Sequence, residues 1–83
     1  MTNAREHACE LRHRFRNETG VIYSVGTWAA MGMSGYGIMV EWDLLPTGRV
    51  GPCLMWHAPD KRTAEAVLDQ LFWLDDARFN PCD

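Results

Sequence analysis

The chain has 83 residues, a formal net charge of −3, a hydrophobic fraction of 47% and four tryptophans. This length allows one core, so we expect a single domain over residues 1–83, and the composition excludes a disordered chain. Residues 1–20 contain four Arg and three Glu, whereas residues 60–83 contain six acidic and three basic residues. A general polyanion binder would show a dominant basic face, which this distribution argues against.

The cysteines Cys9, Cys53 and Cys82 are an odd number, are widely spaced and include no CxxC pair. A secreted disulfide scaffold usually has an even and denser set. The first residues also lack the basic-then-apolar pattern of a signal peptide. The sequence therefore predicts a cytoplasmic protein with reduced thiols.

The first segment, residues 3–16, fits either a helix or a strand. Asn3 followed by Glu6 resembles a capping box, and Leu11 and Phe15 lie on one helical stripe. The residues from Cys9 onward also alternate between apolar and charged side chains, as in a strand. We favour the helix.

The stretch from Thr19 to Val40 contains no charged side chain and is long enough for a membrane-spanning helix. Its β-branched residues, however, gather at the two ends, Val21-Ile22 and Ile38–Val40, around a glycine-rich centre. That pattern is typical of a β-hairpin. We therefore expect two strands here and no membrane association.

Alternation and turn residues predict three strands in all. The expected strands are Val21 to about Ala30, Tyr36 to Asp43, and Val50 to His57, with turns at residues 31–35 and 45–48. Pro52 cannot donate a hydrogen bond to a neighbouring strand. The third strand should therefore begin after Pro52 or lie at an edge of the sheet.

A final helix is expected after Asp60, which is a plausible N-cap. It should end near Leu74, because the acidic residues that follow oppose the helix dipole. Its packing stripe comprises Ala64, Val67, Leu68, Leu71 and Phe72. The predicted fold class is α+β, a small antiparallel three-stranded sheet with an N-terminal and a C-terminal helix (α-β-β-β-α). The runner-up order is β-β-β-β-α.

Two pairs of residues, Cys9 with His13 and Cys53 with His57, have the four-residue spacing of zinc ligands on a helix. On a strand the same spacing separates the side chains by about 13 Å. The strand expected over residues 53–57 therefore argues against a metal site, and equally against Cys53 and His57 as nucleophile and base. Glu41 and Asp43 fit the solvated outer face of a strand better than an acid–base pair. We expect no catalytic, cofactor-binding or metal-binding residue.

The basic cluster comprises Arg12, Arg14, Arg16, Lys61 and Arg62. With Lys61-Arg62 at the start of the last helix, the α-β-β-β-α order resembles the layout of double-stranded RNA-binding domains. That resemblance implies that the start of this helix contacts phosphates. The chain departs from the lysine-rich pattern of that family at Asp60, Glu65 and Asp69, which would repel a nucleic-acid backbone. Nucleic-acid binding through this cluster is the alternative function.

Methionine and aromatic residues gather in the sheet region. One helix cannot cover both faces of a three-stranded sheet, and alternation places Met39 and Met55 opposite Ile38. Part of this set should then be exposed, as in protein interfaces, unless the N-terminal segment covers it as core. The candidate partner-binding residues are Trp28, Met31, Met33, Tyr36, Met39 and Met55.

These features favour a small non-enzymatic interaction protein that binds a larger protein, or itself, through this sheet face. In size and composition the chain is similar to small acidic proteins of phages and other mobile elements, some of which inhibit host proteins. An inhibitor of that kind is one form of the hypothesis. No small-molecule substrate is indicated.

Overall fold

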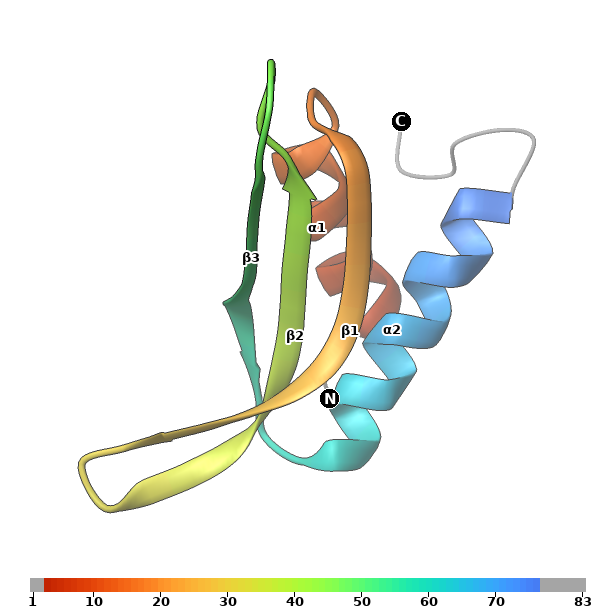
Figure 1. Ribbon diagram of the computed structural model, residues 1–83. Helices are drawn as coiled ribbons and strands as arrows, with labels where there is room; N and C mark the ends of the chain where they lie inside the picture. The colour runs from red at the N-terminus through yellow and green to blue at the C-terminus, as the bar shows by residue number, and fades with distance from the viewer. Residues whose placement is uncertain (1–2, 77–83) are drawn as a thin grey trace.

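The computed structural model describes residues 3–76. It contains α1 (Ala4–Phe15), β1 (Thr19–Ala30), β2 (Met33–Asp43), β3 (Arg49–Ala58) and α2 (Lys61–Asp76). The strands form one antiparallel sheet in the order β1-β2-β3, and both helices lie on the same side of it (Figure 1). The predicted α-β-β-β-α architecture is confirmed, and the runner-up with a first strand is wrong.

Helix α1 forms because its cap and its apolar stripe agree. The Asn3 side chain accepts hydrogen bonds from the backbone amides of Arg5 (3.1 Å) and Glu6 (3.2 Å). These bonds satisfy two amides that have no partner inside the helix. The buried residues of α1 are Ala8, Leu11 and Phe15. A strand over the same residues would divide this stripe between two faces.

The core lies between the two helices and one face of the sheet. Ile38 and Val40 of β2 meet Val67 and Leu71 of α2, and all four side chains are 0% exposed. Aromatic contacts bring α1 onto the same face. The ring centroids of Phe15 and Trp42 lie 5.0 Å apart, and those of His7 and Trp56 lie 4.7 Å apart.

The predicted hairpin over the uncharged stretch is confirmed, but its turn is shorter than expected. Only Met31 and Gly32 form the turn, with φ angles of 53° and 78°. Two consecutive positive φ angles give the two-residue turn whose twist matches that of the flanking strands. The expected turn over residues 31–35 is therefore wrong, because β2 begins at Met33. No helix within residues 3–76 is long and apolar enough to cross a membrane.

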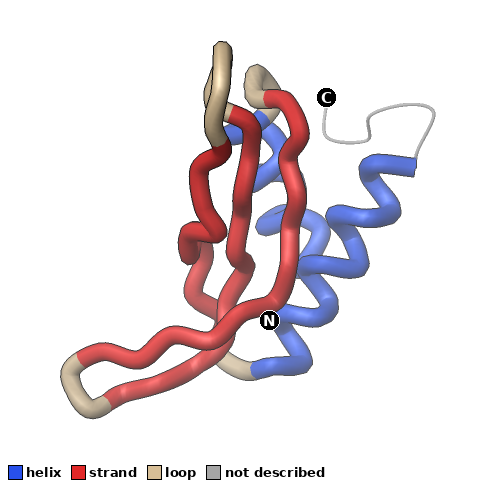
Figure 2. Tube along the Cα trace, viewed as in Figure 1, coloured by secondary structure: helices blue, strands red, loops and turns tan. Residues whose placement is uncertain are grey.

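The hairpin extends beyond the rest of the sheet. Pairing between β1 and β2 continues to Ala30 and Met33, whereas pairing between β2 and β3 ends at Tyr36 and Ala58. Residues 28–35, here called the hairpin arm, thus form a two-stranded ribbon. The arm projects away from both helices (Figures 1 and 2).

The face of the sheet opposite the helices is closed by side chains that lie across glycines. An added Cβ on Gly26 would lie 2.3 Å from Cγ of Met39. On Gly35 it would lie 3.0 Å from the ring of Trp28, and on Gly37 it would lie 2.6 Å from Cδ1 of Leu54. Each glycine therefore leaves space for a larger side chain that extends from the adjacent strand of the sheet. We call this surface the glycine face.

Strand β3 lies at an edge of the sheet, which is one of the two alternatives predicted from Pro52. The other alternative is wrong, because β3 begins at Arg49, before that proline.

Helix α2 starts after Asp60, whose Oδ1 accepts hydrogen bonds from the Thr63 amide (2.7 Å) and hydroxyl (2.8 Å). The helix continues two residues past the expected end at Leu74. Burial of Leu71 and Leu74 holds its last turns on the core, which outweighs the unfavourable acidic end.

We expect Asp60→Asn to lower stability at neutral pH by an amount that shrinks in acid. Hydrogen bonds from the Thr63 amide and hydroxyl lower the pKa of Asp60. The stabilisation is therefore fully present above the unfolded pKa, about 3.9, and is lost as the pH falls through the lower folded pKa. Urea midpoints of the wild type and the variant should converge towards acid pH. Asp69→Asn, on the exposed side of α2, is the matched control, and parallel curves for Asp60→Asn would contradict the assignment.

Gly37→Ala should destabilise the protein by about 1–3 kcal/mol, because the added methyl overpacks the sheet. Its Cβ would lie 2.2 Å from the backbone oxygen of Trp56, so β3 would have to move. Ser24→Ala, at an exposed position of the same face, is the control and should change stability by less than about 0.5 kcal/mol. Urea unfolding measures both, and equal effects of the two variants would refute the close approach at Gly37.

Candidate functional site

The hairpin arm carries the most exposed of the large hydrophobic side chains that the structure describes. Met31 at the turn is 98% exposed, and Met33 beside it is 63% exposed. No residue of the arm belongs to the buried core. The arm is therefore an apolar projection outside the core formed by residues 3–76.

Trp28 fixes the base of the arm. Its indole Nε1 donates a hydrogen bond to the backbone oxygen of Tyr36 (3.2 Å), and its ring lies close over Gly35. The ring also stacks on His57 of β3, with centroids 4.7 Å apart and planes inclined by 16°. The stack on His57 thus connects the arm to β3, and the hydrogen bond to Tyr36 holds the indole on β2. Trp28 is half-buried and holds the base of the arm in place, while Met31 and Met33 remain exposed.

A shallow hollow lies beside this tryptophan. It is lined by Thr27, Trp28, Ala29, Ser34, Gly35 and Tyr36. Its volume, about 320 Å³, is near the lower limit for small-molecule sites. The lining contains no carboxylate, imidazole, thiol or amine, so it offers no group that transfers protons at neutral pH.

The structure brings together four of the six predicted partner-binding residues and separates the other two. Trp28, Met31 and Met33 lie on the arm, and Tyr36 lies at its base. Met39 is on the glycine face, beside Gly26 and outside the arm.

Met55 does not share the face of Met39, and that prediction is wrong. A register shift between Ile38 and Met39 places Leu54, not Met55, opposite Met39. Met55 instead packs against the buried core on the helix side. One extra residue in a strand reverses the face of those that follow, and simple alternation misses it.

The basic residues do not form one patch. Arg12, Arg14 and Arg16 belong to the C-terminal end of α1, whereas Lys61-Arg62 begins α2 at the opposite end of the molecule (Figure 1). Arg14 also donates a hydrogen bond to the backbone oxygen of Met55 (3.4 Å). These two groups therefore do not form one continuous basic surface.

Some of the residues considered for metal binding or catalysis have other bonding partners. Cys9 is disulfide-bonded, so the expectation of reduced thiols is wrong for this residue, whereas Cys53 is free. Cys82 lies outside the described residues. Within residues 3–76 no group of three His, Cys, Asp or Glu side chains could hold a metal ion. Glu41 and Asp43 both form ion pairs with Arg49.

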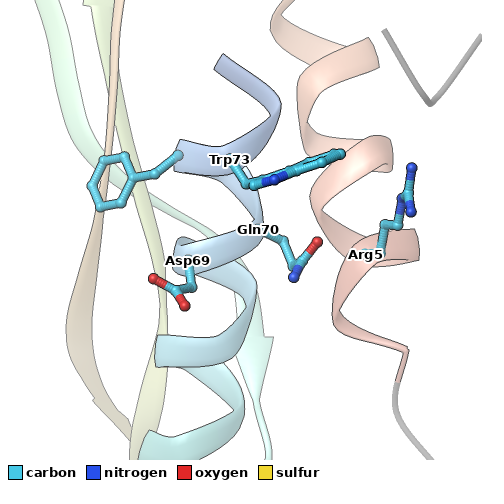
Figure 3. A pocket seen from close by; sticks show the side chains of 5 residues that line it. Arg5, Asp69, Gln70 and Trp73 are labelled. Carbon is cyan, nitrogen blue, oxygen red and sulfur yellow. The ribbon is translucent and has the colours of Figure 1, made fainter. Parts of the chain in front are cut away.

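A second hollow, between the helices, was not anticipated from the sequence. Figure 3 shows Trp73 and Gln70 extending from α2 towards α1, while Asp69 points to another side of the helix. The Arg5 guanidinium lies 5.3 Å from the centre of the Trp73 ring, a cation–π contact.

The prediction that Phe72 belongs to the packing stripe of the last helix is wrong, because this side chain is 53% exposed. It directly follows Leu71, and a helix cannot turn both residues fully towards the core.

Comparison with protein-family models, with curated proteins and with solved structures finds no match to this chain. The function proposed below therefore rests on the geometry of the described residues.

Trp28→Phe should loosen the arm. The variant keeps an aromatic ring but loses the hydrogen bond to the Tyr36 oxygen, which we expect to cost about 0.5–1.5 kcal/mol. Backbone amides of residues 28–35 should exchange with deuterium faster, as measured by mass spectrometry. Trp73→Phe is the matched control and should leave exchange in the arm unchanged. Unaltered exchange in Trp28→Phe would show that this bond does not hold the arm.

Proposed function

We propose that the protein is a non-enzymatic interaction module that binds a protein surface through its hairpin arm. The single observation that carries this proposal is the projection of an uncharged ribbon, ending in the 98% exposed Met31, away from both helices (Figure 2). An isolated two-stranded hairpin is only marginally stable in water and gains from being covered. A protein partner would provide that cover.

The side chains of the arm are suited to a protein partner. Methionine is flexible and polarisable, so Met31 and Met33 can adapt to an irregular apolar pocket. The Trp28 contacts hold the base of the arm before binding, which reduces the entropy lost on association. The free edges of the ribbon offer backbone groups for strand addition.

The charge pattern supports a protein over a polyanion as partner. Residues 19–40 include neither Lys nor Arg, the side chains that phosphate contacts require. Glu65 and Asp69 on the exposed surface of α2 could instead steer the protein towards a basic surface. Inhibition of a host protein by a mobile-element product is one setting in which such a module would act, and a cytoplasmic location remains part of the proposal.

Nucleic-acid binding through Arg12, Arg14 and Arg16 stays the alternative. It requires retention of duplex RNA or DNA that weakens with salt and with joint replacement of the three arginines. The separation of the two basic groups in the structure weighs against it.

Exposed methionines on the arm should be required for partner binding. We expect the double variant Met31→Ser/Met33→Ser to lose at least about 90% of the species that the wild type retains from a lysate of its native host, because these side chains supply the apolar contact. Leu44→Ser/Leu45→Ser is the matched control. These leucines are 55% and 74% exposed in the loop at the other end of the sheet. Undiminished retention by the arm variant would overturn the proposed site.

A further inference from the structure

We infer that the arm pairs with the arm of a second copy of this chain, strand to strand and antiparallel, across a twofold axis. This inference rests on the proposed function and names its partner. It follows from the two edges of the sheet, from the side chains of the arm and from the placement of the charges.

The two edges of the sheet differ in how they prevent association. Edge strand β3 carries the charged Arg49 and the ring of Pro52, and its pairing with β2 shifts register twice. Charges, prolines and bulges of this kind block the addition of another strand. Strand β1 has no charge and no proline along its 12 residues, and its pairing is regular from Ile22 to Ala30. Among the described residues, β3 is thus protected against strand addition and β1 is left open.

The open edge is most accessible in the arm. At Trp28–Ala30 the strand β1 has β2 on one side and no strand on the other in the described sheet. Alternate amides and carbonyls on that side lack a sheet partner. The identical edge of a second copy offers the matching groups in antiparallel orientation, and a twofold interface of this type closes without forming a filament.

Side-chain size favours this pairing. Ala29 and Ala30 are small and exposed on β1, and Ser34 lies across from Ala29 on β2. These small side chains let two ribbons approach closely. Met31 of each copy could then lie over the ribbon of the other, which would cover the most exposed apolar surface of the described chain.

The distribution of charge also favours pairing of two copies through their arms. Each chain has a net charge of −3, so association through charged surfaces would be repulsive. The arm is neutral, and Glu41 and Asp43 lie on the part of β2 away from the arm, where both pair with Arg49. Pairing through the arms keeps the acidic groups of the two copies apart. An arm of eight residues gives a small interface, below the roughly 800 Å² per partner of a standard complex, so the dimer should be weak.

The test is sedimentation velocity of the full chain over a concentration series from micromolar to near-millimolar. The wild type should pass from monomer to dimer. Ala29→Lys should raise the dissociation constant at least about tenfold, because it places like charges across the shared edge. Ala66→Lys, the same substitution at an exposed position of α2, should dimerise as the wild type does. Met31→Lys is the second arm variant and should weaken the dimer too, and circular dichroism checks that each variant folds.

A wild type that stays monomeric throughout the series overturns the inference, as does a dimer that both arm variants preserve. Either result is separable from failure of the proposed function. If the wild type is a monomer but Met31→Ser/Met33→Ser still loses the captured species, the arm binds a different protein and only the self-pairing is wrong. If capture is also unaffected, both proposals fall.

Discussion

The architecture depends on glycines that allow one face of the sheet to be closed without a helix. Both helices pack on the same side, so the opposite side has to be covered by the strands' own side chains. Met39, Trp28 and Leu54 do this by lying over Gly26, Gly35 and Gly37, where a Cβ would collide with them. The glycine face therefore covers this side of the sheet, where a further layer of helices would otherwise be needed. Placing Trp28 flat against the backbone also sets the position from which the arm leaves the sheet.

At the other end of the sheet, Arg49 joins the three strands where the core no longer does. Its guanidinium donates to Glu41 and Asp43 of β2 and to the backbone oxygen of Gly20 in β1 (2.8 Å). Surface ion pairs contribute at most about 1 kcal/mol each, so this group adds little to global stability. The Arg49 contacts instead hold the ends of the three strands in register where the hydrophobic core does not reach. The two ends of the sheet are therefore stabilised differently, by ions at one and by an indole at the other.

Much of this fold could be predicted from local patterns. Helix α1 was predictable because the Asn3 cap and the apolar stripe that ends at Phe15 agree. Helix α2 was predictable from the Asp60 cap and the apolar repeat that follows it. The hairpin was predictable because β-branched residues flank a glycine-rich centre. The length of its turn was not, since a methionine with positive φ at Met31 leaves no clear signal in the sequence. Residues 31–35 of the arm were therefore expected to be a loop.

The candidate site was predictable only in part, for a related reason. Composition indicated that methionine and tryptophan would be exposed, and Met31 and Met33 are. The face of Met55 depended on a register shift, which arises from pairing between strands and not from any single strand. The separation of the basic groups depended on the relative placement of α1 and α2, which no local pattern records.

The arm lies outside the hydrophobic core, and this has a consequence for how the chain can change over generations. If the arm binds a partner as proposed, substitutions in residues 28–35, other than at Trp28 and Gly35, would change the binding surface and leave the packing around Ile38 and Leu71 unchanged. The proposed binding surface and the hydrophobic core thus lie on separate parts of the molecule. Under the proposed function, a lineage selected to recognise new partners could vary the six other positions of the arm and keep the same scaffold.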